Sequence, residues 1–186
     1  MLMRKIINLP NLLTLGRILI TPFIVYSILN GFAIQALALM VIAGLTDMLD
    51  GAIAKHFHIQ TVVGAYMDPI ADKLMLVGSI ISLFITGQVP MFLFLAVVFR
   101  DVIIIIGAMA YELVTHRLEM QPTYLSKVTT VVQIVYVSTA LLHIAYPLPI
   151  VLVDTAAWIT FALTCMSGVQ YMLLWTNKAM HEENAS

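Results

Sequence analysis

The chain has 186 residues, of which 61% are hydrophobic and only 10% are charged. Because soluble domains carry about 25% charged residues, this composition predicts an integral membrane protein. The net charge of −1 gives no basic field for nucleic acid, so we expect no nucleic-acid partner. The single cysteine excludes an intrachain disulfide and a cysteine-rich metal site.

Apolar segments long enough to cross a bilayer, at about 20 residues each, follow one another along the chain. Short breaks containing Gly or Pro, or longer polar ones, separate them, and no linker or repeat divides the chain. The sequence therefore predicts an all-α, polytopic membrane protein with one domain, 1–186, preceded by a short interfacial segment at 1–8. The six expected transmembrane helices are 12–30, 33–54, 65–86, 90–112, 126–145 and 149–176.

Positive charge is distributed unevenly among the breaks. All nine Lys and Arg residues fall at or near one set of helix ends, and three of the breaks contain none. Since cytoplasmic loops are enriched in Lys and Arg, this asymmetry places both termini on the cytoplasmic side. The aspartate cluster described next lies on the same side.

Four aspartates stand at fixed spacing in one short stretch. Asp47 and Asp50 are three residues apart, and Asp68 and Asp72 are four apart, so on helices each pair shares one face. One Asp at a bilayer centre costs roughly 2.5–3.5 kcal/mol, so four together indicate a function. They suit either divalent cations, which prefer oxygen ligands, or a proton relay. The tight clustering favours metal binding. The more distant alternative is a proton-coupled carrier, which more often has its carboxylates on several helices.

The whole pattern resembles the signature of the CDP-alcohol phosphotransferase family, Asp-x2-Asp-Gly-x2-Ala-Arg-x8-Gly-x3-Asp-x3-Asp. Only Lys55 departs from it, because the family usually has Arg there; Lys keeps the charge but not the planar fork. The resemblance implies a site with Mg²⁺ or Mn²⁺, two ions in all, and Asp72 serving also as general base. It implies two sets of residues: Asp47, Asp50, Asp68 and Asp72 as metal ligands, and Asn11, Gly51, Ala54, Lys55 and Gly64 around the CDP-linked lipid.

Family members transfer the phosphatidyl group of a CDP-linked lipid, usually CDP-diacylglycerol, to an acceptor hydroxyl, releasing CMP. The pair Arg100-Asp101 and the residue Ser126 look more like cardiolipin synthases of eukaryotic type than like phosphatidylglycerophosphate synthases, which tend to have Arg-Glu and Gly there. We therefore expect phosphatidylglycerol as the acceptor, with glycerol-3-phosphate as the alternative. The resemblance also suggests a homodimer, and we expect it in a bacterial inner membrane, among membrane lipids.

Three cations are natural partners for the acceptor phosphate: Arg17, Arg100 and Lys127. Each has a simpler interpretation. Arg17 would extend to the membrane interface, Arg100 would be neutralised locally by Asp101, and Lys127 would be an interfacial lysine.

Overall fold

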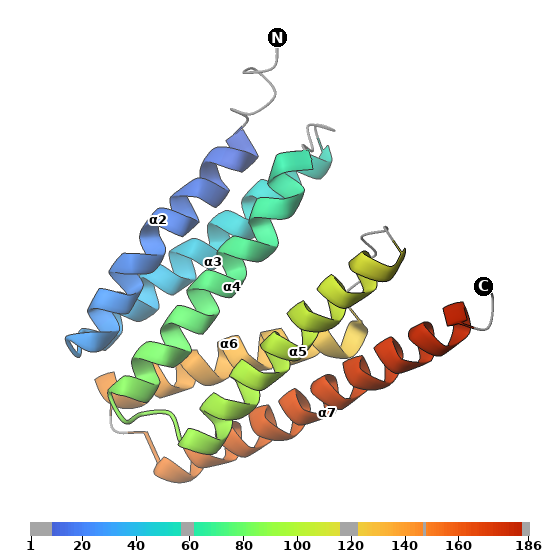
Figure 1. Cartoon of the computed structure of the whole chain (residues 1–186). Helices are drawn as coiled ribbons and strands as arrows, with labels where there is room; N and C mark the ends of the chain where they lie inside the picture. Colours follow the sequence, from blue (N-terminus) through green and yellow to red (C-terminus); the bar gives the residue numbers. More distant parts are fainter. Residues whose placement is uncertain (1–8, 57–61, 116–122, 147, 184–186) are drawn as a thin grey trace. The chain divides into compact units, whose positions relative to one another are not determined.

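The structure is a computed structural model, and it describes residues 9–56, 62–115, 123–146 and 148–183. These residues form helices joined by short turns, and no strand occurs among them. The helices are α2 (Leu9–Leu29), α3 (Ala33–His56), α4 (Val62–Ile85), α5 (Met91–Thr115), α6 (Tyr124–Ala145) and α7 (Ile150–Glu183). The all-α prediction is confirmed, and each helix matches one expected apolar segment (Figure 1). The expected interfacial segment at 1–8 lies outside the described residues.

Three of the described helices are long and apolar enough to cross a membrane: 12–29 of α2, 124–145 of α6 and 150–176 of α7. The prediction of six transmembrane helices is thus supported in part. Many large apolar side chains are exposed along all the helices, as expected of surfaces that face lipid.

Glycines at two helix ends explain where α2 and α4 stop. Gly31 and Gly87 have φ angles of 76° and 75°, a left-handed conformation that glycine adopts without steric cost. At each end the glycine N–H bonds a carbonyl three residues back, and the following N–H bonds one five residues back. This is the Schellman arrangement, which satisfies the last carbonyls of a helix and reverses the chain.

The chain forms two compact units. The first comprises residues 1–88 and 137–148, and the second comprises residues 89–136 and 149–186. Helix α6 contributes its second half to the first unit and its first half to the second. The single-domain prediction is not tested by this division.

In the first unit, α2 packs against both α3 and α4 (Figure 1). Small residues allow these helices to approach closely. On α3, Ala36 and Ala43 are fully buried on one face. On α4, a Cβ at Gly78 would lie 3.2 Å from the Val25 side chain of α2. Close approach of this kind is how helices associate in membranes.

In the second unit, α5 packs along α7. Gly107 of α5 lies directly against the indole of Trp175 on α7, because a Cβ there would come within 2.5 Å of Nε1. Near the start of α7, the rings of Phe92 and Trp158 stack with centroids 4.7 Å apart. Phe161 meets both rings edge-on.

Candidate active site

Two levels of polar side chains lie on the first unit. Arg17 stands eight residues after the start of α2, Asp47 nine residues before the end of α3, and Asp72 ten residues after the start of α4. At about 1.5 Å per residue, all three lie about 12–15 Å from those ends. Thr14 and Asp68 stand about 7–9 Å from them by the same measure. The antiparallel order of the helices therefore brings together residues that are distant in sequence.

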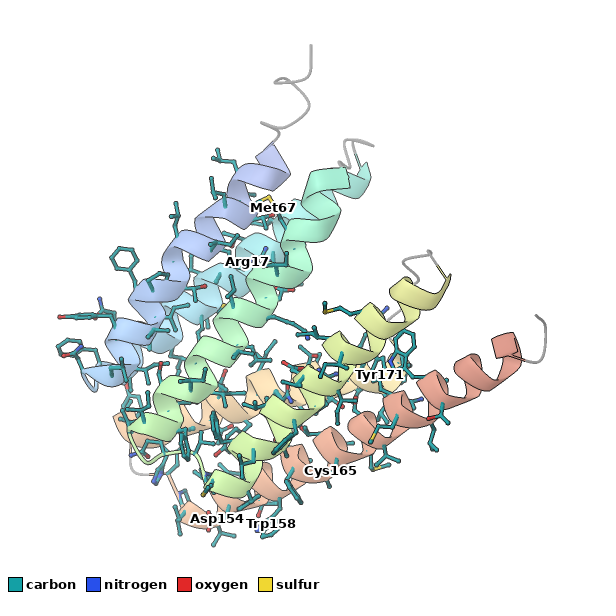
Figure 2. All side chains as sticks on the ribbon, in the orientation of Figure 1. Arg17, Met67, Asp154, Trp158, Cys165 and Tyr171 are labelled. Atoms are coloured by element: carbon teal, nitrogen blue, oxygen red, sulfur yellow. The ribbon has the colours of Figure 1, made fainter. Side chains whose placement is uncertain are left out.

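Arg17 links the two deeper carboxylates. Its Nη1 donates to Oδ1 of Asp72 at 2.7 Å, and its Nη2 lies 2.6 Å from Oδ1 of Asp47. The Arg17 side chain is 0% exposed, whereas those of Asp47 and Asp72 are 40% and 47% exposed. One guanidinium therefore holds α3 and α4 to α2 at this level, and Figure 2 labels Arg17 within this group of helices.

The burial of Arg17 excludes the simpler of its two sequence interpretations. The side chain does not extend to the membrane interface, because it is fully buried and paired with carboxylates. A buried ion pair of this kind depends on both partners, since removing one leaves an uncompensated charge. Its assignment to an acceptor phosphate remains a prediction.

Thr14 is a site residue that the sequence reasoning missed. Its hydroxyl donates to Oδ1 of Asp68 at 2.6 Å, and the residue is 1% exposed. A hydrogen bond to a carboxylate fixes the direction of the oxygen lone pairs. Thr14 stands three residues before Arg17, so both lie on one face of α2; that spacing was the available signal.

The remaining predicted residues are placed by their backbones alone. Asp50, Gly51, Ala54 and Lys55 lie in the last turns of α3, Gly64 lies in the first turn of α4, and Asn11 lies in the first turn of α2. Their side chains are outside the described part of the structure. The nucleotide-site assignments therefore remain predictions.

The aspartate oxygens are ligands of the type that a hard divalent cation prefers. Among the described side chains, which do not include Asp50, no three metal-ligating groups lie close enough together to hold such an ion. Asp47 and Asp72 already share one positive charge, that of Arg17. The carboxylate of Asp72 is also close enough to those of Asp47 and Asp68 to interact electrostatically with each. Carboxylate oxygens converging in this way are what Mg²⁺ and Mn²⁺ prefer.

A second polar cluster lies in the second unit around Arg100. Its Nη1 donates to Oδ1 of Asp101 at 2.6 Å, and its Nη2 donates to the hydroxyl of Ser126 at 2.5 Å. Longer contacts of 3.4 Å reach the hydroxyl of Ser167 on α7. Arg100 is only 5% exposed. It pairs with Asp101, as its simpler interpretation predicted. By contrast, Lys127 is exposed in the first turn of α6.

Known proteins are similar to this chain over most of its length. The model of the CDP-alcohol phosphatidyltransferase family matches residues 7–175. The chain therefore belongs to the CDP-alcohol phosphatidyltransferase family, as the aspartate motif indicated.

Individual relatives fall into two groups. A probable cardiolipin synthase (CMP-forming) of Drosophila melanogaster is 35% identical over 153 residues, which cover 74% of this chain and 48% of that protein. A CDP-diacylglycerol–glycerol-3-phosphate 3-phosphatidyltransferase of Aquifex aeolicus is 29% identical over 172 residues, covering 91% of this chain and 93% of that protein. The cardiolipin synthase (CMP-forming) of Rattus norvegicus is 35% identical, covering 72% of this chain and 50% of its own. The chain thus spans about half the length of the cardiolipin synthases it matches.

Proposed function

We propose that this chain is a cardiolipin synthase, which transfers the phosphatidyl group of CDP-diacylglycerol to phosphatidylglycerol and releases CMP. The observation that carries the proposal is the convergence of Asp47, Asp68 and Asp72 on one face of α2. In a member of this family, that convergence supports a role for the motif's carboxylates in holding a diphosphate and its counter-ions.

Asp47, Asp50, Asp68 and Asp72 would hold Mg²⁺ or Mn²⁺, and bound ions would neutralise the diphosphate and the charge of departing CMP. The acceptor hydroxyl oxygen forms a bond to the phosphorus that carries diacylglycerol, and the anhydride P–O bond breaks. CMP takes that bonding electron pair, and the hydroxyl proton passes to Asp72. The half-exposed Asp72 carboxylate is accessible to an incoming hydroxyl, as a general base requires.

Gly51, Ala54, Lys55 and Gly64, with Asn11, would line the nucleotide. Their positions in the facing turns of α2, α3 and α4 support this, because all three helices present those turns at the same end as the carboxylates. Lys55 would supply one positive charge to the diphosphate. It offers a point charge in place of a bidentate fork.

The choice of acceptor rests on the Arg100 cluster. Both residues that resemble cardiolipin synthases, Asp101 and Ser126, are direct partners of Arg100. The carboxylate of Asp101 offsets the charge of Arg100, and the hydroxyl of Ser126 accepts a hydrogen bond from its other terminal nitrogen, so Arg100 presents little net charge. That suits the single negative charge of a phosphodiester such as phosphatidylglycerol better than the double charge of a phosphate monoester. Lys127, which is exposed in the same unit as Arg100, would provide further positive charge near the acceptor.

Phosphatidylglycerophosphate synthesis is the second candidate. The observation that favours it is the relative from Aquifex aeolicus, a glycerol-3-phosphate transferase that this chain covers almost end to end. In that reaction the attacking hydroxyl belongs to glycerol-3-phosphate, and the carboxylates would have the same roles.

A direct assay separates the two reactions. Purified protein with Mg²⁺ and labelled CDP-diacylglycerol would receive phosphatidylglycerol or glycerol-3-phosphate separately, and the labelled lipid would be identified. Cardiolipin and CMP formed only with phosphatidylglycerol are the expected result. Phosphatidylglycerophosphate formed with glycerol-3-phosphate would instead support the second candidate reaction. If neither acceptor gave a lipid product, both reactions would be refuted.

We place the enzyme in a bacterial inner membrane, as a homodimer with the carboxylates facing the cytoplasm. The distribution of Lys and Arg supports the orientation. Accessibility of an engineered cysteine near residue 127 to a membrane-impermeant reagent, in inverted and in right-side-out vesicles, would test it. Cross-linking in native membranes would test the dimer.

A further inference from the structure

Arg17 is a permanent positive charge at the centre of the carboxylate cluster. An arginine guanidinium stays protonated at all physiological pH values, so its charge cannot be removed by burial. Here it is fully buried, and each terminal nitrogen is bonded to a different aspartate. Neither Asp47 nor Asp72 therefore offers its Oδ1 freely to another cation.

Each partner in this arrangement needs the other. Asp47 and Asp72 lie close enough to repel each other, and Arg17 offsets that repulsion. In turn, a buried guanidinium without a carboxylate would be strongly destabilising. The ion pairs thus help to hold α2, α3 and α4 together.

We propose that Arg17 is a resident counter-cation that competes with the divalent ion for Asp47 and Asp72. Its guanidinium keeps the two carboxylates close together before an ion binds. When the ion binds, the guanidinium loses its hydrogen bond to at least one of them. This inference rests on the proposed function only in taking these carboxylates as the ion site.

Like charge is the reason for competition. A divalent ion bound to Asp47 and Asp72 would lie near a guanidinium already bonded to the same two groups, and both cations are positive. The buried position of Arg17 reduces solvent screening of that repulsion. Removing the charge of Arg17 therefore has two opposite effects: the metal-free protein loses stability, and its affinity for the ion rises.

The test uses the full chain, purified in detergent and stripped of metal, with Mn²⁺ as the probe. Calorimetry measures the dissociation constant of Mn²⁺, and thermal unfolding measures the stability of the metal-free protein. In Arg17→Gln we expect Mn²⁺ to bind at least about tenfold more tightly, because a like charge beside the ion is gone. The metal-free melting temperature should fall in the same variant.

Arg17→Lys gives a second measurement if Arg17→Gln does not fold. Lysine keeps the charge, but as a point charge it cannot bond both carboxylates through a planar fork. We expect Mn²⁺ affinity between that of the wild type and Arg17→Gln. Mn²⁺ binding that is unchanged or weaker in the folded variants would overturn the inference, as would failure of Mn²⁺ to bind any of the proteins.

Arg100→Gln is the matched control, since it also removes a buried arginine paired with an aspartate. It should lower the melting temperature and leave Mn²⁺ affinity unchanged. An equal gain in affinity there would show a general charge effect and would overturn the role of Arg17. Lipid transfer by the wild type is a separate readout. If the wild type transfers lipid but Arg17→Gln binds Mn²⁺ no more tightly, only this inference is refuted. If the wild type is inactive but Arg17→Gln binds Mn²⁺ more tightly, only the proposed reaction is refuted.

Discussion

Replacing Thr14 with valine isolates the hydrogen bond that orients Asp68. Valine has nearly the same shape as threonine but lacks the hydroxyl, and Thr14 is almost completely buried. The lost bond joins Oγ1 of Thr14 to a carboxylate oxygen 2.6 Å away. Hydrogen bonds to charged groups contribute about 1.5–3 kcal/mol.

The lower end of that range applies, because Asp68 is only half-buried and water replaces part of the bond. About 1.5 kcal/mol corresponds to roughly a tenfold change in an equilibrium constant. Groups that orient metal ligands typically contribute about 10–100-fold to metal affinity, which agrees with this figure. We therefore expect the Mg²⁺ concentration for half-maximal transfer from CDP-diacylglycerol to rise about tenfold in Thr14→Val.

Two controls sharpen the measurement. Thr14→Ser keeps the hydroxyl and should stay close to the wild type. Ser27→Ala removes a buried hydroxyl of the same helix that bonds only the carbonyl of Phe23, so its Mg²⁺ dependence should not change. An unchanged Mg²⁺ requirement in Thr14→Val, or an equal defect in Ser27→Ala, would refute the orienting role of Thr14.

Three further variants test the site and the packing. Asp47→Asn should abolish both nucleotide binding and turnover. Asp72→Asn should lose about 10²–10⁴-fold in kcat but still bind CDP-diacylglycerol with Mg²⁺, as measured by calorimetry; an equal loss of binding in both variants would make Asp72 chiefly a metal ligand. Lys55→Arg should retain activity and Lys55→Ala should raise the KM for CDP-diacylglycerol, so an unchanged KM in the alanine variant would remove Lys55 from the nucleotide site. Gly107→Ala should lower the free energy of unfolding by about 1–3 kcal/mol, since its Cβ would meet the Trp175 indole; denaturation of Gly107→Ala with and without Trp175→Leu tests this, because the smaller side chain should recover part of the loss.

The helices were predictable because their causes are local. Each apolar segment is long enough for a helix, and the glycines at 31 and 87 mark where two of them end. The last helix continues to Glu183, beyond the predicted end at 176, because an apolar run does not record where a polar helix end stops.

The aspartates of the site were also predictable, since their spacing along the chain is itself the signal. Asp68 and Asp72 share one face of α4 because they are one helical turn apart. The sequence also singled out Arg17 as a candidate site residue. It could not show which groups Arg17 contacts.

Only the tertiary structure decided the partners. Arg17 meets Asp47 and Asp72, and Thr14 meets Asp68, because α2 packs against α3 and α4 at one particular depth and rotation. Likewise, Arg100 is paired with Asp101 beside it in sequence and donates a hydrogen bond to Ser126 of another helix. Helical periodicity determines which residues share a face, but the packing of side chains between helices determines which faces meet and at what level. That packing depends on every contact along the interface, so no short stretch of sequence carries it.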